Sequence, residues 1–383
     1  MTSLAIPTGV DDPINQQILA VSEDRLLGFI PEPFARIAEL TGLEQSAIIE
    51  RIRAMLSAGT IRRVRQTLMT TSLAPGALVA WRVPPSRLNE AFDWLFQNDP
   101  FTGHVVIRTT DEGAAGSQYR LWTTLKVPVG FSMQRHADLL LERIGAEDVI
   151  LMPAKKVFAL GVGHIRRRGL EPGARADKPG KVRNATPVHL EPTQWRVLLA
   201  LKRELSPDEI VPEPWRGRAQ ELGMDYQTFL DTAASLEQAG VIGRFSTFLE
   251  HIKKLSDGAQ VTRYNALFHW AVPPGREIDA GCEVGRHLVM THAYWRPTGE
   301  QFNHVNIMGV AHGGDRDLLL EHKAAIDRHL AEAGMAVTYT NVFWGGRSEI
   351  KPSEIDPRAY AHWLRGLDID PATMRDGETP VEL

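Results

Sequence analysis

The chain has 383 residues, of which 43% are hydrophobic and 23% are charged, a composition typical of soluble globular proteins. Its length is sufficient for about two to four domains. No apolar run approaches the roughly 20 residues that a membrane span needs, and residues 1–10 lack the basic start and apolar core of a signal peptide. The lone Cys282 excludes an internal disulfide and a cysteine-clustered metal site. We therefore expect a cytoplasmic protein, and the formal net charge of −4 argues against a strongly DNA-binding chain.

The sequence contains an internal repeat, in which several motifs of the first half recur in the same order in the second half. A Pro-Glu-Pro motif at 31–33 opens a stretch that ends near 63, and the same motif at 212–214 opens a stretch that ends near 244. Further on, Trp-x-Val-Pro-Pro at 81–85 recurs at 270–274, and a His-x-x-x-Arg spacing at 104–108 recurs at 292–296. A two-copy repeat of this length indicates a fused pseudo-dimer.

Residues 12 to 69 predict three short helices followed by a strand. Asp12 and Pro13 form a helix-start signal, the second helix runs from about 33 to 40, and the third runs from about 45 to 58. In the third, Ile48, Ile52 and Met55 fall on one face at helical spacing. Residues 61–69 then alternate like a strand. This order is typical of a winged helix-turn-helix.

After residue 69 the spacing of hydrophobic residues changes from the helical period to the alternation of extended strands. Strands are expected at 77–83, 105–109, 119–127 and 156–160, with helices at 86–97 and 133–144. Strand-helix-strand-strand-helix-strand is the ferredoxin-like order.

The second half repeats both patterns. Helices are expected between 192 and 239, a wing from 242, strands at 264–272, 289–295, 305–310 and 335–343, and helices at 277–287 and 316–333. The predicted fold class is α+β, a tandem repeat of a winged helix-turn-helix and a ferredoxin-like (βαββαβ) domain. The expected domains are a winged helix at 11–72, a ferredoxin-like domain at 73–164, a linker at 165–188, a winged helix at 189–255, a ferredoxin-like domain at 262–345 and a tail at 346–383.

A winged helix first suggests DNA binding, in which the third helix enters the major groove. The first copy's third helix carries Arg51 and Arg53, but the second copy's equivalent helix carries acidic residues and neither Lys nor Arg. These are Asp225, Asp231 and Glu237. Carboxylates facing a phosphate backbone would repel it, so we expect a scaffold rather than a nucleic-acid partner.

The second copy has instead gained residues suited to chemistry. His251 lies in its wing where the first copy has Thr70, and His312 ends a strand where the first copy has Lys126. Arg244, His292 and Arg296 accompany them. Each histidine taken alone is more often structural than functional. Together, histidines and arginines suit an anionic ligand and a proton donor near neutral pH.

Four segments of the chain resemble the signatures of the siroheme decarboxylases, which are built on the Lrp/AsnC architecture of a winged helix plus a ferredoxin-like domain. Residues 242–251 are similar to the family's wing, 292–297 to its His-x-Tyr-x-Arg-Pro stretch and 305–313 to the strand that ends in His-Gly. Residues 119–125 resemble the partner subunit's Tyr-Asn-Leu-Trp signature. The second half thus resembles one of the family's two related subunits and the first half its partner, here fused as in heme d1 biosynthesis.

The sequence also departs from the family pattern. Arg120 replaces the family's Asn, Val64 its Phe, and Thr70 the first copy's wing histidine. In the second half, Val305 replaces an aromatic residue, and Glu250 and the insertion at 253–262 alter the wing. The active site is therefore expected in the C-terminal half, with the N-terminal half as a supporting partner.

The resemblance implies that the chain removes carboxyl groups from acetate side chains of an iron tetrapyrrole, its substrate and partner, with no cofactor required. Such chemistry calls for a general acid and for cations that orient the carboxylate. On this reading His251 or His312 donates the proton, Arg244 and Arg296 clamp carboxylates, and either histidine could instead ligate the iron axially. The remaining expected substrate contacts are His292, Asn306, Phe245, Trp295, Met308, Arg63, Arg120 and Trp122.

Three alternatives remain open from the sequence. One is a transcriptional regulator of the Lrp/AsnC type that senses a small molecule or heme. Another is a tetrapyrrole carrier or sensor that releases its ligand unchanged, because an axial and a catalytic histidine look alike. A purely structural partner subunit is the third. A monomeric pseudo-dimer and a homodimer are both compatible with the fusion.

Overall fold

The computed structural model describes residues 6–69, 73–161, 163–180, 182, 188–250 and 260–377. They form two compact units, each built from parts of both sequence halves. The wing unit comprises Met1–Met69, Gly161–Gly169 and Val188–Arg263, and the sheet unit comprises Thr70–Leu160, Leu170–Pro187 and Tyr264–Leu383. Among the described residues, no helix combines the length and apolar character that a membrane crossing requires.

The wing unit contains the two predicted three-helix sets. The first set is α1 (Pro13–Ser22), α2 (Pro33–Thr41) and α3 (Gln45–Ser57), and the second is α6 (Pro192–Lys202), α7 (Trp215–Glu221) and α8 (Tyr226–Gln238). A three-stranded sheet in the order β1-β8-β2 joins them, from β1 (Leu26–Leu27), β8 (Ile242–Leu249) and β2 (Ile61–Leu68). Because β2 and β8 pair antiparallel, the wing of one copy is completed by the wing of the other.

Local sequence signals set the ends of these helices. The Asp12 side chain accepts hydrogen bonds from the backbone N–H groups of Ile14 and Asn15 at the start of α1. Gly42 ends α2 at a φ of 73°, in the left-handed region that glycine tolerates.

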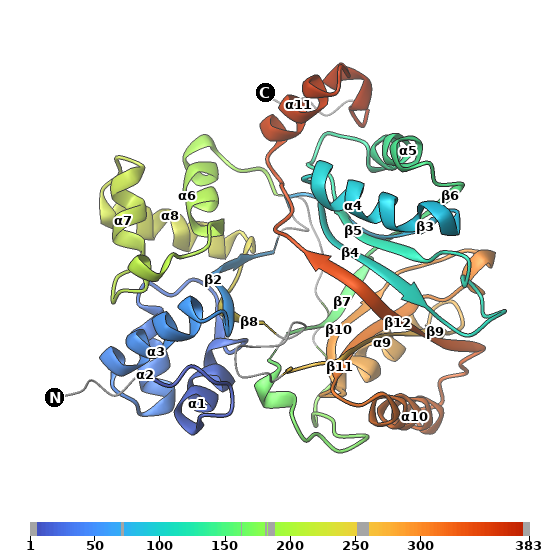
Figure 1. Ribbon diagram of the computed structural model, residues 1–383, viewed down its shortest axis with the longest axis horizontal. Helices are drawn as coiled ribbons and strands as arrows, with labels where there is room; N and C mark the ends of the chain where they lie inside the picture. The colour runs from blue at the N-terminus through green and yellow to red at the C-terminus, as the bar shows by residue number, and fades with distance from the viewer. Residues whose placement is uncertain are drawn as a thin grey trace. The chain divides into compact units, whose positions relative to one another are not determined.

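The sheet unit is built on one nine-stranded sheet in the order β6-β3-β5-β4-β12-β9-β11-β10-β7. From the first half come β3 (Gly76–Arg82), α4 (Leu88–Asn98), β4 (Thr102–Thr109), β5 (Leu121–Lys126), α5 (Met133–Ile144), β6 (Asp148–Pro153) and β7 (Lys156–Leu160). From the second half come β9 (Tyr264–Ala271), α9 (Glu277–Arg286), β10 (Met290–Trp295), β11 (Ile307–Gly313), α10 (Arg316–Glu332) and β12 (Tyr339–Ile350). Each half has the predicted ferredoxin-like order, and β4 of one pairs with β12 of the other (Figure 1).

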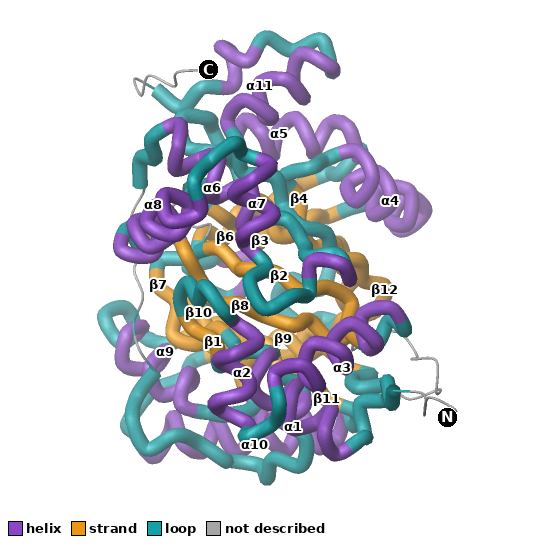
Figure 2. The backbone as a smooth tube through the Cα atoms, turned by 90° about the vertical axis from the view of Figure 1, so that its left-hand side faces the viewer, coloured by secondary structure: helices purple, strands orange, loops and turns teal. Residues whose placement is uncertain are grey.

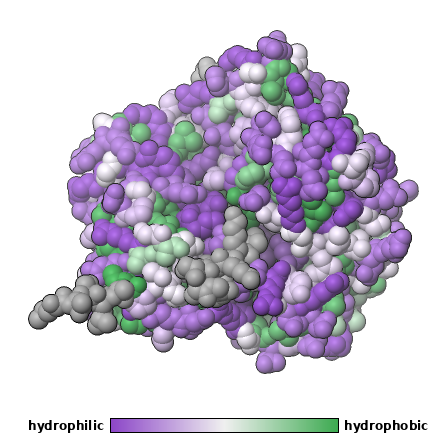
Figure 3. All heavy atoms as spheres, in the orientation of Figure 1, coloured by the Kyte–Doolittle hydropathy of each residue, from purple (hydrophilic) through white to green (hydrophobic). Residues whose placement is uncertain are grey.

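Three buried clusters hold the sheet unit together. One lies between the first half of the sheet and α4 and α5, and a second lies between the second half and α9 and α10. The third joins side chains of both halves and includes Trp122, Met308 and Phe343. The helices and strands of this arrangement can be followed in Figure 2. The surface in Figure 3 is mainly hydrophilic, with hydrophobic residues scattered over it.

The structure corrects one strand assignment. The sequence predicts 156–160 as the fourth strand of the first ferredoxin-like repeat, but that strand is β6, which pairs with β3. Residues 156–160 form β7 instead and pair with β10 of the second half. Two short apolar strands separated by two residues look alike in sequence, and only sheet register decides which edge each one covers.

The segment expected as a tail from 346 begins inside β12, which runs to Ile350. It continues into α11 (Pro357–Gly366), whose buried Tyr360 and Leu364 belong to the first-half core. This C-terminal helix therefore packs on the sheet unit.

Candidate functional site

Three neighbouring strands of the sheet unit, β9, β11 and β10, bring together four polar residues. His312 on β11 lies directly opposite Asn265 on β9. On the other side of β11, Met290 faces Ala311 while His292 faces Val310, so Thr291 is an extra residue in β10. Such a β-bulge re-aims a side chain. We call Asn265, Thr291, His292 and His312 the sheet histidine cluster.

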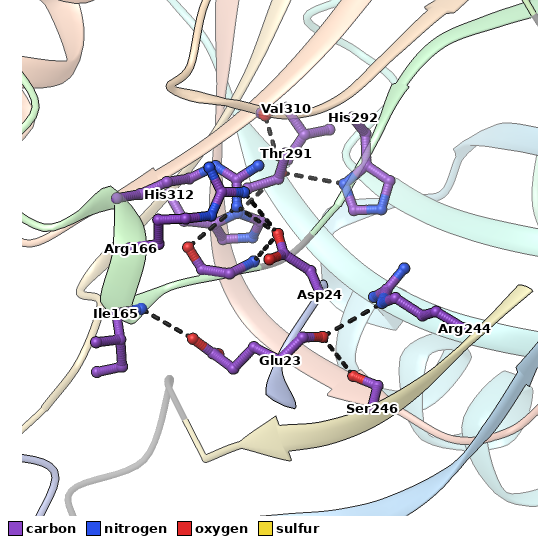
Figure 4. A network of polar contacts seen from close by, with 12 residues as sticks. Glu23, Asp24, Ile165, Arg166, Arg244, Ser246, Thr291, His292, Val310 and His312 are labelled. Carbon is purple, nitrogen blue, oxygen red and sulfur yellow. Dashed lines mark hydrogen bonds and ion pairs between the residues drawn. The ribbon is translucent and has the colours of Figure 1, made fainter. Parts of the chain in front are cut away.

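Hydrogen bonds connect the whole cluster through the Thr291 hydroxyl. Thr291 Oγ1 donates to the carbonyl oxygen of Val310 at 2.9 Å and lies 3.1 Å from His292 Nδ1 (Figure 4). The same oxygen lies 3.3 Å from Nδ1 of His312, whose Nε2 is 3.1 Å from Asn265 Nδ2. The two histidines are therefore oriented by one shared hydroxyl.

His292 and Tyr294 on β10 and Arg296, which follows the strand, occupy alternate positions and form a stacked row. The rings of His292 and Tyr294 are nearly parallel, at 19° and with centroids 6.0 Å apart. The Arg296 guanidinium lies 4.5 Å from the centroid of the Tyr294 ring and donates to the carbonyl oxygen of Met152. Burial lowers the pKa of Arg296, and Tyr294 opposes that shift. An arginine always stays charged, so the row ends in a buried cation.

The wing unit holds a second group of cations, which we call the wing arginine cluster: Arg62, Arg63, Arg65 and Arg244. Arg63 pairs with Glu204 at 3.3 Å, and Arg65 lies over the Phe248 ring at 5.4 Å. Burial, and after it the neighbouring Arg63, lowers the pKa of Arg65 to about 10. Crowded arginines of this kind suit a ligand with several carboxylates.

A carboxylate pair at the end of α1 anchors residues 163–167 within the wing unit (Figure 4). Asp24 accepts from Arg166 at 2.8 Å and from the Gly163 backbone at 2.9 Å, and Arg166 and Gly163 lower its pKa against burial. The neighbouring Glu23 accepts from the Ile165 backbone at 2.9 Å, and burial raises its pKa to about 8. The backbone oxygen of Glu23 also accepts from Arg244 Nε at 3.2 Å.

Several residues expected to contact substrate are engaged elsewhere. Both ends of the Asn306 amide pair with the Val272 backbone, at 2.9 and 2.8 Å, so this side chain ties two chain segments together. Phe245 is fully buried and packs edge-to-face against Phe34 and Trp215 in the wing unit. Such contacts are those of a structural core.

The other expected aromatic and apolar contacts also pack in cores. Trp122 and Met308 are buried in the cluster that joins the two sheet halves, and the Trp122 indole N–H donates to the Tyr119 carbonyl. Trp295 is half-buried against the second-half core, and Arg120 is half-buried before β5. His251 lies outside the described residues.

The structure adds residues that sequence reasoning missed: Asn265, Thr291, Tyr294 and Arg108. Tyr294 lies inside the second copy of the repeated His-x-x-x-Arg motif, and Arg108 is the arginine of its first copy, so the repeat pointed to these two. Thr291 precedes the motif, and its role follows only from the bulge in β10. Asn265 gave no local signal. Its place opposite His312 follows only from the pairing of β9 with β11. Among the described residues, no group of three His, Cys, Asp or Glu side chains could hold a metal ion.

Comparison with known proteins gives consistent results. Residues 73–159 match the family model of the AsnC-like ligand binding domain. The chain is 25% identical over 317 residues to a siroheme decarboxylase of Hydrogenobacter thermophilus, covering 81% of this chain and 87% of that protein. It is also 25% identical over 154 residues to a siroheme decarboxylase alpha subunit of Desulfovibrio desulfuricans, covering 39% of this chain and 82% of that subunit.

The crystal structure of the siroheme decarboxylase NirDL superposes with a TM-score of 0.62. The match covers 92% of this chain and 98% of that chain at 19% identity, so the two share a fold. The separate subunit corresponds to less than half of this polypeptide, whereas the Hydrogenobacter protein matches most of it. The chain is thus a relative of the siroheme decarboxylases that carries two subunit-like halves in one polypeptide.

Proposed function

We propose that this protein is a carboxy-lyase that removes carboxyl groups from acetate side chains of a siroheme-like iron tetrapyrrole. The observation that carries the proposal is the sheet histidine cluster, with the buried Arg296 on the same strand motif. A relative along most of the chain is a siroheme decarboxylase, and a NirDL structure of the same fold was solved with an iron-uroporphyrin III analogue. A substrate with several carboxylates suits the residues present.

The reaction balances without an oxidant or reductant. The bond between the methylene carbon and the carboxylate breaks, carbon dioxide leaves, and one proton is taken up at the methylene carbon for each carboxyl group lost. The electron pair released by the broken bond needs a sink, which transient protonation of the pyrrole ring supplies. The protein must therefore deliver a proton near neutral pH, and histidine is the side chain suited to that task.

The cations have the complementary task of holding carboxylates as anions. A guanidinium always stays charged and binds a carboxylate through two parallel hydrogen bonds, so it orients the group without protonating it. Arg296 is fixed by Tyr294 and by the Met152 carbonyl, which pre-organises its charge. In the wing unit, the wing arginine cluster offers similar chemistry, and Arg63 and Arg244 remain proposed substrate contacts.

No added organic cofactor enters this proposal, because proton transfer and charge stabilisation suffice for the bond changes. Nucleic acid is not proposed as a partner. In the first copy, Arg51 of α3 donates to Asp12 and Asn15 at 2.7 and 2.9 Å, so this cation is engaged within its own unit. In the second copy, α8 carries Asp231 and Glu237, which disfavour a phosphate backbone.

Single substitutions test the assignment of the proton chemistry. His292→Gln and His312→Gln keep a polar side chain but can neither deliver nor relay a proton, so we expect each to lower turnover of siroheme by about 100-fold or more. Binding, followed by the shift of the tetrapyrrole absorption band, should weaken far less. Full turnover in both variants would remove this cluster from the mechanism.

A further inference from the structure

Arg108 on β4 is a buried cation whose nearest polar side-chain partner is an amide. Its side chain is 4% exposed and makes no ion pair with a carboxylate among the described residues. Its Nη1 donates to Asn265 Oδ1 at 3.1 Å, while its Nε is buried and has no hydrogen-bond partner within the described part of the chain. Burial lowers the pKa of Arg108 to about 10. A guanidinium can only donate, so it fixes which end of the Asn265 amide faces it.

The orientation of Asn265 in turn fixes the proton on His312. With Oδ1 turned toward Arg108, Nδ2 faces His312 Nε2 at 3.1 Å. An amide NH₂ group only donates, so His312 Nε2 must accept and carries no proton in this arrangement.

The contact on the other side of the His312 ring independently places the proton on Nδ1. Thr291 has one hydroxyl proton, and the carbonyl oxygen of Val310 receives it at 2.9 Å. Thr291 Oγ1 can therefore only accept from His312 Nδ1, at 3.3 Å. Both ends of the ring require a proton on Nδ1 and a lone pair on Nε2.

A glycine makes the contact between Arg108 and Asn265 possible. Arg108 and Asn265 lie on β4 and β9, which are separated by β12, and Gly345 of β12 is paired with Arg108. A Cβ atom at position 345 would lie 3.2 Å from the Cβ atom of Asn265 and 3.4 Å from its Cγ atom. The missing side chain lets the guanidinium reach across the intervening strand.

We propose that Arg108 and Asn265 are positioning residues that hold His312 in its neutral form, protonated on Nδ1, with Nε2 as a hydrogen-bond acceptor. The catalytic consequence rests on the proposed function. In this arrangement His312 accepts or relays a proton rather than donating the one that reaches the substrate, and its Nε2 is engaged by Asn265 rather than by a metal. Arg108 is the first-copy counterpart of Arg296, so the N-terminal half contributes to the site.

The test is the ¹⁵N spectrum of histidine-labelled full-length protein at pH 8, in which protonated and unprotonated ring nitrogens differ clearly. His312→Gln identifies the His312 signals by their loss. In the unsubstituted protein we expect a protonated Nδ1 and an unprotonated Nε2. A proton on Nε2 would overturn the proposal.

Two variants test separately the contact between Asn265 and His312 and the contact between Arg108 and Asn265. Asn265→Asp keeps the shape of the side chain but can only accept, so we expect Nε2 of His312 to become protonated. Arg108→Met removes the guanidinium, so Asn265 can rotate and His312 should show more than one protonation form. Unchanged His312 signals in both variants would contradict the proposal. If Arg108→Met does not fold, Gly345→Ala perturbs the same link and should also change the signals.

Ser348→Ala is the matched control. It removes a 2.8 Å contact to His104, the first-copy counterpart of His292, and should leave the His312 signals unchanged. With siroheme as substrate, Arg108→Met should lower kcat by roughly 10- to 100-fold with a smaller change in KM, by analogy with the outer-shell partners that orient metal-ligating histidines. The spectra do not depend on substrate. If the spectra are as expected but siroheme is not turned over, the proposed function is refuted while the positioning role of Arg108 and Asn265 stands.

Discussion

One hydroxyl group, that of Thr291, orients both histidines of the sheet histidine cluster. It can do so because a bulge in β10 turns it toward its neighbours. The single hydroxyl proton goes to the Val310 carbonyl, so both histidines donate from Nδ1 to the same oxygen. The tautomers of His292 and His312 are thereby coupled to one small side chain.

Thr291→Val removes the hydroxyl while keeping the shape of the side chain. Losing one net hydrogen bond should lower the free energy of unfolding by about 1 kcal/mol. Turnover should fall by about 100-fold, because misplacing a catalytic group by a small distance has that effect. Steady-state kinetics and thermal melts measure the two. Thr338→Val, which removes a hydroxyl bonded to the Ala271 carbonyl, should leave kcat unchanged. Equal losses in both variants would contradict the role of Thr291.

His269 is a buried histidine that the proposed chemistry does not use. It is fully buried near Trp122 and Phe343, with Asn341 as its cross-strand neighbour. Burial, and after it Arg108 and Lys323, lowers the pKa of His269 to about 3. The ring is therefore neutral in the folded protein.

Between about pH 6.5 and 3 the unfolded chain binds a proton at His269 that the folded chain does not. The free energy of unfolding should therefore fall as the pH drops through this window, by up to about 1.4 kcal/mol per pH unit for one group. His269→Phe should make the melting temperature less sensitive to acid. His362→Gln, at an exposed position, should leave the pH dependence as it is. An unaltered slope in His269→Phe would show that His269 is not responsible.

At the scale of elements, the end of α1 holds residues 163–167 through two carboxyl groups in opposite protonation states. Asp24 is ionised and paired with Arg166 and Arg167. Glu23 is buried, and its pKa is raised to about 8 because burial disfavours its charged form. One neutral and one charged carboxyl side by side avoid repulsion.

The raised pKa of Glu23 predicts how stability varies with pH. From about pH 4.5 to 8 the folded protein keeps a proton that the unfolded chain loses, so the free energy of unfolding should fall as the pH rises. Glu23→Gln imitates the neutral acid and should raise the melting temperature at pH 8 more than at pH 5. Asp24→Asn should instead lower it at both values, because it breaks the pairs with Arg166 and Arg167. Destabilisation by Glu23→Gln at pH 8 would contradict this assignment.

Some elements of the fold could be predicted from the sequence because their signals are local or repeated. Helix ends were predictable because capping signals such as Asp12 and Gly42 are local. The two copies of the ferredoxin-like order were predictable because their periods and spacings repeat. The choice between β6 and β7 was not, since it depends on which sheet edge each strand meets.

The candidate site residues likewise fall into those with a local sequence signal and those that only strand pairing brings together. His292, Arg296 and His312 could be named as candidates from the sequence because they stand in motifs. Asn265 lies 47 positions from His312, and Arg108 lies 157 positions from Asn265, so only strand pairing brings them together. Phe245 and Met308 are expected substrate contacts because core and pocket residues share one composition, and the structure places both in buried packing.

At the scale of the whole molecule, the two sequence halves are interleaved in both units. In the wing unit β2 pairs with β8, and in the sheet unit β4 pairs with β12 and β7 with β10. These pairings join the two sequence halves within one chain.

Dividing the chain after the exposed Gly169 tests this interleaving. Co-expressed fragments 1–169 and 170–383 should purify together at a one-to-one ratio, because the three strand pairings remain available. Val105→Pro in the first fragment removes ladder hydrogen bonds in β4, which pairs with both β5 and β12, and should reduce recovery of the complex. Independent elution of the unaltered fragments would contradict the pairing.

Decarboxylation is tested by anaerobic incubation of the purified protein with siroheme, without any added cofactor, followed by mass spectrometry of the tetrapyrrole. We expect products that have lost the mass of carbon dioxide from acetate side chains, and little such product from His292→Gln or His312→Gln. A tetrapyrrole that binds with a shifted absorption band but keeps its full mass would contradict the account and favour a carrier or sensor.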